Sequence, residues 1–366
     1  METDAIPVMR PLLPAADSLM PYLRAIDGSR TYSNMGPLSN QLSDRLRTRF
    51  AGEILPTANA TVALSVALTA VQAAPGTLCV VPAWTFAASG HAIVAAGLVP
   101  FLVDVDHTSQ ALTPDLAAEA VARAPAKVGA IMLISPFGAP LDPEPWQRFA
   151  HDHGVPVVVD AAAGFDTVQS SMLATVVSLH ATKVLGAGEG GFIVCRDTAV
   201  MDRARAIANF GFAHGRRQAA LPGFNAKASE YQAAVALAAL DHWPATRAAF
   251  AATLLGLRRA LPKTVAWPPG LGSDWVASTA CVTLDGDARS MAAHCQTHAI
   301  ATRRWWEDGL HCQPAFSTCP RLPLPVTDTL ARRVLGLPCS MDMTDGEIDR
   351  IGRAVASFPS ADQPAT

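Results

Sequence analysis

Charged residues are scarce in this sequence, and basic residues are not in surplus. Asp, Glu, Lys and Arg together make up 16% of the 366 residues, and the formal net charge is −3. Proteins that bind nucleic acid or anionic membrane surfaces need a basic patch to attract them. The composition therefore gives no electrostatic reason to expect either kind of partner.

Paired cysteine motifs, internal repeats and membrane-length apolar runs are also absent. The seven cysteines are an odd number without a CxxC pair, so we expect reduced thiols, several of them buried, and no metal site. The first residues, METDAIPVMRPLLPAAD, lack the basic start and apolar block of a signal peptide. We therefore expect a cytoplasmic protein.

Apolar residues, by contrast, form half of the chain, which is long enough to bury a substantial core. Short segments rich in Val and Ile alternate with helical segments such as Pro114–Arg123. This alternation predicts an α/β fold with a mostly parallel sheet covered by helices on both faces. The predicted strands are Leu78–Val81, Leu98–Val103, Val128–Ser135, Val155–Val159, Ala174–Leu179 and Phe192–Cys195.

We expect three parts: an N-terminal arm at 1–20, a large domain at 21–243 and a smaller α/β domain at 244–366. The boundary falls where Pro244 begins a long helix. Helices within 19–50 are expected to lie outside the core. For the smaller domain we predict strands at Trp275–Leu284 and Ala331–Leu335, and helices at Arg289–His298 and Thr344–Phe358.

Lys183 lies between two apolar runs and is followed by four glycines within six residues, at 186, 188, 190 and 191. Lysine is rarely buried unless it is paired, and burial lowers its pKa, which makes the amine a usable nucleophile. Glycine lets backbone approach a ligand closely. The alternative is an ordinary turn with a lysine that reaches the solvent, and on this segment alone it is favoured.

Asp160 ends the apolar strand Val155–Val159 and is followed by three alanines. An unpaired carboxylate at the edge of a core is costly, so we expect a cationic group to face it. Capping of a following helix by Asp160 explains the position equally well.

Small and polar residues, Thr57–Thr61, precede the apolar helix predicted at Val62–Ala74. The first amides of a helix have no intrahelical partner, and a buried helix start is therefore a candidate phosphate site. An ordinary N-cap is the alternative. Phe86 follows the strand Leu78–Val81 in the next predicted turn, where ligands of such sheets gather.

Together these features match the needs of pyridoxal 5′-phosphate (PLP). Its aldehyde needs a lysine, its ring nitrogen a carboxylate, its ring a flat apolar cover, and its phosphate amides and a hydroxyl. The sequence offers these parts in the order Thr61, Phe86, Asp160 and Lys183.

Seven segments resemble, in order and spacing, the DegT/StrS-type nucleotide-sugar aminotransferases of fold type I, over about Leu19 to Phe358. These segments are SNMGPL, ANATVALSVAL, VPAWTFAASGHAIVAAGLVPFLVDVD, VVVDAAA, SLHATKVLGAGEGG, GFNAKASEYQAA and TRRWWEDGLHCQPAF. The resemblance implies a large domain with a seven-stranded, mostly parallel sheet and a smaller C-terminal domain.

The resemblance also implies a role for each matching residue. Lys183 would form the Schiff base with the cofactor aldehyde and then act as the base that moves the substrate proton. Asp160 would pair with the ring nitrogen, and Phe86 would stack on the ring. The phosphate would be bound by the amides of Ala60 and Thr61, by the Ser178 hydroxyl and by Asn225 of the neighbouring subunit in a homodimer.

Four further residues are given weaker roles by the same resemblance. We expect Glu189 to support the loop that carries Lys183, and His180 to be packed rather than catalytic. Trp306 and His311 are candidates for the substrate edge, with packing equally favoured for Trp306. One departure stands out: where the family has glutamine or histidine three residues after the aspartate, this sequence has Ala163, which cannot bond the ring hydroxyl.

The hypothesis is a PLP-dependent aminotransferase that moves an amino group from an L-amino acid, most simply glutamate, to a nucleotide-linked keto-deoxysugar, for surface polysaccharide or secondary-metabolite sugars. Two alternatives remain: elimination at a sugar by the same cofactor, and a regulator that binds PLP without turnover. The identity of the sugar is expected to depend on the loops at 32–38, 214–218 and 303–316.

Overall fold

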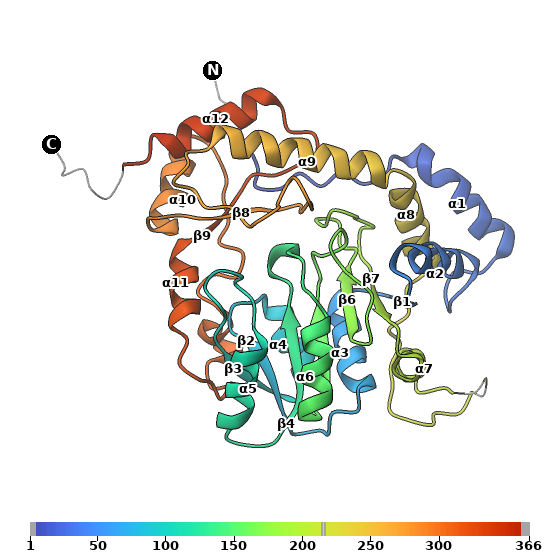
Figure 1. Cartoon of the computed structure of the whole chain (residues 1–366). Coiled ribbons are helices and arrows are strands. Elements are labelled where there is room, and N and C mark those ends of the chain that lie inside the picture. The colour runs from blue at the N-terminus through green and yellow to red at the C-terminus, as the bar shows by residue number, and fades with distance from the viewer. Residues whose placement is uncertain (1–4, 214, 216, 360–366) are drawn as a thin grey trace.

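The computed structural model describes residues 5–213, 215 and 217–359, so His214 and Arg216 of the predicted 214–218 loop lie outside the described residues. Seven strands form one sheet in the order β1-β7-β6-β5-β4-β2-β3 (Figure 1). Their bounds are β1 Glu53–Thr57, β2 Leu78–Pro82, β3 Val99–Val103, β4 Val128–Ile134, β5 Val157–Asp160, β6 Ala174–Ser178 and β7 Gly191–Cys195.

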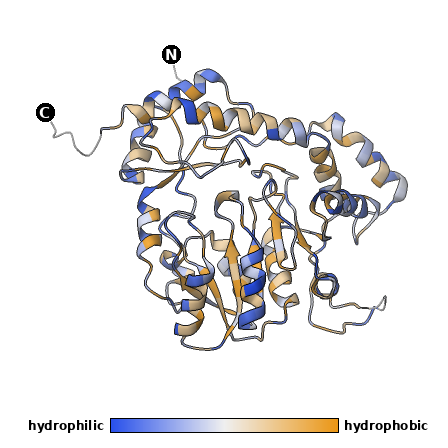
Figure 2. Cartoon of the chain, viewed as in Figure 1, coloured by the Kyte–Doolittle hydropathy of each residue, from blue (hydrophilic) through white to orange (hydrophobic). Residues whose placement is uncertain are grey.

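The sheet is mostly parallel, as predicted. Strands β6, β5, β4, β2 and β3 run parallel to one another, and β7 runs antiparallel to both β1 and β6. Figure 2 shows that the central strands are hydrophobic along their length. This composition fits strands that are buried on both faces.

Alternate residues of the strands enter two different apolar clusters. Cys79 and Val81 pack with residues of α3 (Ala60–Ala70), α4 (Ala87–Ala95) and α7 (Thr198–Ile207). Leu78 and Val80 pack on the opposite side with residues of α5 (Pro114–Arg123) and α6 (Glu144–His153). The sheet is therefore covered on both faces, and the predicted α/β class is confirmed.

The prediction that 19–50 lies outside the core was wrong. Helices α1 (Ala16–Ser29) and α2 (Pro37–Phe50) pack against α8 (Glu230–Asp241). Leu42 and Leu46 of α2 are 1% and 0% exposed and belong to the main apolar cluster. Their i, i+4 spacing gives the helix one apolar face, and α8 provides a surface to bury it.

The C-terminal part begins with the long helix α9 (Trp243–Ala260), which packs against α12 (Asp345–Ala356) above the main sheet (Figure 1). Strand β8 (Ala280–Thr283) pairs antiparallel with β9 (Val334–Leu337). Helices α10 (Ala288–Thr297) and α11 (Pro325–Arg333) complete it, and short 3-10 turns lie at Pro136–Gly138, Leu310–Cys312 and Pro314–Phe316. The domain division at 243/244 stays a prediction.

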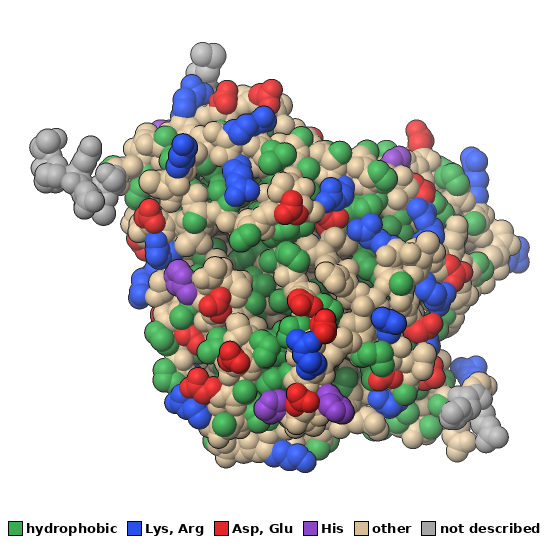
Figure 3. Space-filling view, viewed as in Figure 1, with side chains coloured by type: hydrophobic (Ala, Val, Ile, Leu, Met, Phe, Trp, Pro, Cys, Tyr) green, Lys and Arg blue, Asp and Glu red, His purple; other side chains and the backbone are tan. Residues whose placement is uncertain are grey.

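Two predicted strands need correction, and one strand was missed. The strand predicted at Trp275–Leu284 is confined to Ala280–Thr283, and residues 331–333 of the strand predicted at Ala331–Leu335 belong to α11. Strand β1 was not anticipated. Within the described residues, no helix is long and apolar enough to cross a membrane. On the face shown in Figure 3, acidic and basic side chains are mixed.

Candidate active site

Asp160 is the last residue of β5, between β4 and β6 in the middle of the sheet. Its side chain is buried, and its Oδ1 accepts a hydrogen bond of 3.1 Å from the amide of Ala162. Burial raises the pKa of the Asp160 carboxyl. Hydrogen bonds from Ser89 and Ala162 and the positive charge of Lys183 act in the opposite direction and lower it. The carboxylate needs its neighbours to stay charged.

Ser89 is the neighbour that sequence reasoning missed. Its hydroxyl donates to Asp160 Oδ2 at 2.8 Å, and the Thr85 hydroxyl lies 2.8 Å from Ser89 Oγ. Both hydroxyls are buried, at the start of α4. Their only signal in the sequence is the i, i+4 spacing of two hydroxyls in an apolar stretch, which is common in helices.

Phe86 precedes α4 as its N-cap, and its carbonyl accepts from the Ser89 amide at 3.1 Å. The Phe86 side chain is 58% exposed. Phe86 thus lies at the carboxyl edge of the sheet, three residues before Ser89, which binds Asp160. The chain itself leaves the Phe86 ring exposed.

Lys183 follows β6 in the lysine loop, residues 179–190, which also contains three glycines, and a fourth, Gly191, begins β7. Its amide donates to the His180 carbonyl at 2.9 Å. Burial lowers the pKa of the Lys183 ammonium, and the negative charge of Asp160 partly opposes this effect. The structure therefore brings Lys183 and Asp160 near enough for each to influence the pKa of the other, although 22 residues, β6 and the loops on either side of it, separate them.

Ser178 lies at the end of β6, beside Asp160 on β5. Its amide donates to the Ala162 carbonyl at 3.2 Å, and its partner across the sheet is Gly191 of β7. A Cβ atom added to Gly191 would come within 2.8 Å of the Ala60 nitrogen. Gly191 is therefore needed for α3 to begin directly beside Ser178.

The start of α3 leaves two amides available to a ligand. Asn59 caps the helix, and its Oδ1 accepts from the Val62 amide at 2.9 Å. Among the described residues, no acceptor is found for the amides of Ala60 and Thr61. Together with the positive end of the helix dipole, they form a typical phosphate-binding arrangement.

Asn225 is exposed and forms an isolated bridge with Asn209. The next residue, Ala226, accepts a hydrogen bond of 2.8 Å from the Ala58 amide. Asn225 thus belongs to a segment that is attached beside the start of α3, with its own side chain on the surface.

His180 and Glu189 are hydrogen-bonded parts of the lysine loop. His180 Nδ1 accepts from the Thr182 amide at 3.3 Å, and Nε2 lies 3.6 Å from Glu189 Oε1. The Glu189 carbonyl accepts from Gln232 at 3.1 Å. These contacts connect the two ends of the loop and attach it to α8.

Trp306 is 8% exposed and stacks on Phe137, with ring centroids 4.1 Å apart. Trp84 packs edge-on against it at 5.0 Å. Trp306 therefore packs against two other aromatic rings. His311 Nε2 lies 3.2 Å from Asp328, while its Nδ1 is buried and has no partner among the described residues.

Ala163 lies against the turn that follows β4. Gly138 has a φ of +95°, and a Cβ there would come within 2.5 Å of the Ala163 carbonyl oxygen. The turn Pro136–Gly138 therefore packs directly on this backbone, at the position where the family has glutamine or histidine.

Comparison with known proteins gives a consistent picture. The profile of the DegT/DnrJ/EryC1/StrS aminotransferase family matches residues 16–356. The dTDP-4-amino-4,6-dideoxy-D-glucose transaminase of Shigella dysenteriae is 32% identical over 64% of this chain and 64% of its own length. The UDP-N-acetyl-3-dehydro-alpha-D-glucosamine 3-aminotransferase of Acidithiobacillus ferrooxidans is 30% identical over 81% of this chain and 82% of its own.

Solved structures agree with these relatives. The crystal structure of DesI, determined in the presence of its TDP-sugar product, superposes with a TM-score of 0.86 at 28% sequence identity. The match covers 96% of this chain and 92% of DesI.

Proposed function

The chain belongs to the DegT/DnrJ/EryC1/StrS aminotransferase family, whose members depend on PLP, and we propose that it moves an amino group from glutamate to a keto carbon of a nucleotide-linked deoxysugar. The two transaminases named above act on dTDP- and UDP-linked sugars, and DesI forms a TDP-sugar product. These three names support a nucleotide sugar as the substrate class.

The residues fit the cofactor. When bound, PLP supplies an aldehyde that condenses with amines and a protonated ring that accepts electrons. The buried, hydrogen-bonded Asp160 would keep that ring nitrogen protonated, and the exposed ring of Phe86 offers a surface for stacking. The amides of Ala60 and Thr61, with the Ser178 hydroxyl beside them, suit the phosphate.

The proposal rests on the positions of Asp160, at the end of β5, and of Lys183, in the loop after the neighbouring strand β6, where the charge of Asp160 influences the pKa of the lysine. Burial lowers the pKa of Lys183 and so increases the fraction of neutral amine, the form that can bind the cofactor covalently and, once displaced, can accept and return the substrate proton. The charge of Asp160 at the other end of the site holds the acidic proton of the ring.

We further propose that the enzyme is a cytoplasmic homodimer in which Asn225 reaches the phosphate site of the neighbouring subunit. The exposure of Asn225, despite its attachment beside α3, supports a partner outside its own chain. Replacement of Asn225 by alanine should then weaken cofactor binding in both subunits.

The test is the absorption spectrum of the purified protein with and without glutamate. The wild-type protein should show the band of lysine-bound PLP, which borohydride reduces and glutamate removes. Lys183→Ala should lack the reducible band, and a band that persists would refute the role of Lys183. Loss of the glutamate-induced change with retention of the band would favour an elimination or a non-catalytic role.

A further inference from the structure

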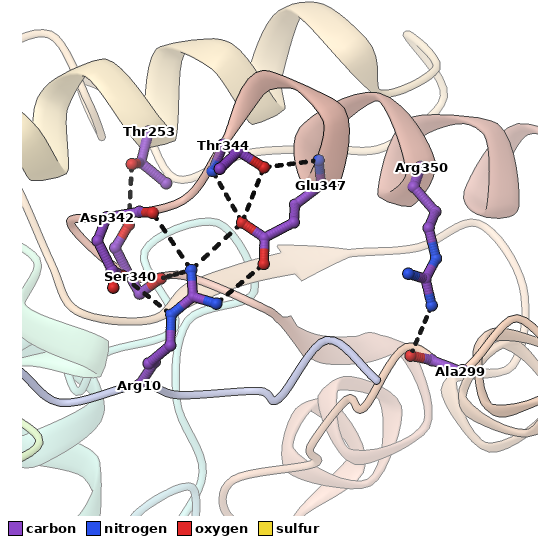
Figure 4. A network of polar contacts seen from close by, with 8 residues as sticks. All are labelled: Arg10, Thr253, Ala299, Ser340, Asp342, Thr344, Glu347 and Arg350. Atoms are coloured by element: carbon purple, nitrogen blue, oxygen red, sulfur yellow. Dashed lines mark hydrogen bonds and ion pairs between the residues drawn. The ribbon is translucent and has the colours of Figure 1, made fainter. Parts of the chain in front are cut away.

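A segment of the N-terminus crosses from the C-terminal part of the chain to the lysine loop. We call residues 5–15 the strap. Ile6 forms a bridge with Ile300, in which the Ile6 amide donates to the Ala299 carbonyl at 2.9 Å. The same carbonyl accepts from Arg350 of α12 at 3.2 Å (Figure 4). The first half of the strap is thus attached to the C-terminal part.

Arg10 provides the second attachment, at the centre of the network in Figure 4. Its guanidinium binds both carboxylate oxygens of Glu347, at 2.9 and 3.2 Å, and its Nε lies 3.0 Å from Asp342 Oδ1. A bidentate pair of this kind fixes orientation as well as distance. Glu347 is held in turn by the Thr344 amide at 2.8 Å, in the cap of α12.

Beyond Arg10 the strap reaches the lysine loop. A small cleft is lined by residues 9–12 of the strap, by 181–184 of the lysine loop and by 339–341 of the C-terminal part. Leu13 packs so closely on the loop that a Cβ at Gly186 would lie 2.9 Å from the Leu13 Cδ2 atom. Lys183 itself lines the cleft.

We propose that Arg10 is a positioning residue for the lysine loop: it ties the strap to Asp342 and Glu347, so that residues 9–13 stay closed over the loop and limit access of water to Lys183. The proposal rests on the proposed function only in that Lys183 is the reactive amine. Ile6 is 2% exposed and anchors the first half of the strap in the core. Leu12 and Leu13 are 62% and 36% exposed, so apolar burial holds the second half only weakly, and there the ion pairs of Arg10 become decisive.

The strap has a measurable consequence for Lys183. Burial is the largest influence on the pKa of this lysine and lowers it, while the charge of Asp160 raises it. A looser strap would admit water and relieve the burial. The pKa of Lys183 should then rise toward the ordinary value of about 10.4.

The experiment measures the reactivity of Lys183 with trace acetic anhydride, which reacts with the neutral amine, in the full-length, cofactor-free chain over a range of pH. Mass spectrometry compares the peptide that contains Lys183 with those of Lys127 and Lys263, which are exposed and serve as internal references. The midpoint of rate against pH reports the pKa, and the plateau reports access. Neither quantity involves PLP or substrate, so failure of the proposed function would leave this test valid.

For Arg10→Ala we expect a plateau about fivefold higher, the factor that corresponds to about 1 kcal/mol, and a midpoint at higher pH. Arg10→Lys keeps one ion pair but loses the bidentate geometry, and it should fall between the two. Glu347→Gln removes the acceptor charge but can keep the helix cap, and it decides the matter if Arg10→Ala does not fold.

Arg148→Ala is the matched control, since Arg148 forms an exposed ion pair with Glu144 on α6. It should leave both quantities unchanged. Folded Arg10→Ala and Glu347→Gln proteins with the wild-type plateau and midpoint would overturn the proposal, as would an equal change in Arg148→Ala.

Discussion

The Ser89 hydroxyl donates its proton to Asp160, with Ser89 Oγ 2.8 Å from Asp160 Oδ2. Because a hydroxyl has one proton, the Thr85 hydroxyl, 2.8 Å from Ser89 Oγ, must be the donor in the next hydrogen bond. Two buried hydroxyls thus form a chain of hydrogen bonds, from Thr85 to Ser89 and from Ser89 to the carboxylate. This arrangement stabilises the charged form of Asp160 against the effect of burial.

Replacement of Ser89 by alanine should raise the pKa of Asp160 further, since it removes a contribution that lowers it. A hydrogen bond to a charged group is worth about 1.5–3 kcal/mol, so we expect kcat to fall by about tenfold or more. Steady-state kinetics and a pH titration of the cofactor absorbance measure the two effects. Ser43→Ala, which removes a hydroxyl bonded to a helix carbonyl in α2, is the control; an equal loss there would contradict a specific role.

Replacement of Phe86 by alanine should weaken cofactor binding with little effect on folding. The ring is 58% exposed, and exposed substitutions usually change stability by less than about 0.5 kcal/mol. Loss of aromatic stacking costs about 0.5–1.5 kcal/mol, a rise of roughly two- to tenfold in the Kd for PLP. Fluorescence titration with PLP and thermal unfolding measure the two. Val94→Ala, at an equally exposed position of α4, should change neither; unchanged PLP affinity in Phe86→Ala would refute stacking.

Replacement of Glu230 by alanine should destabilise the protein strongly. Glu230 is 1% exposed and accepts from the amides of Leu38 and Ser39, at 2.7 and 3.0 Å, at the start of α2. The variant leaves two buried amides without a partner, at about 1–3 kcal/mol each. Urea unfolding should show this loss, whereas Glu119→Ala, an exposed position on α5, should unfold like the wild type. A stable Glu230→Ala protein would mean that α2 is held by its apolar face alone.

The contribution of Glu347 to stability should disappear in acid. Its hydrogen bond with Arg10 lowers the pKa of Glu347 to about 2, below the ordinary value of about 4.3. A lowered pKa means that the stabilisation is complete above the ordinary value and is lost as the pH falls toward 2. The difference in unfolding free energy between wild type and Glu347→Gln should therefore shrink from pH 5 to pH 2. A constant difference would contradict the ion pair.

Much of the fold could be predicted because its signals are local. The alternation of Val-rich segments with helices located β2 to β7 to within a few residues. Strand β1 was missed because its five residues contain Pro56 and depend on pairing with β7, far along the chain. Residues 331–333 were assigned to a strand because β9 follows α11 directly, with no glycine or proline between them to mark the end of the helix.

From the sequence alone, the order of Thr61, Phe86, Asp160 and Lys183 and the seven segments that resemble the family predicted the class of the protein. Neither Lys183 nor Asp160 decided it alone, because each also has an ordinary structural explanation, and their roles stay predictions. Tertiary structure decided what surrounds them. Ser89 is 71 positions from Asp160 in the sequence. Arg10, which is proposed to hold the strap, is 173 positions from Lys183. Hydroxyls and surface arginines occur in every sequence. Only the fold places the Ser89 hydroxyl against Asp160 and the strap beside the loop of Lys183, because both contacts join distant parts of the chain.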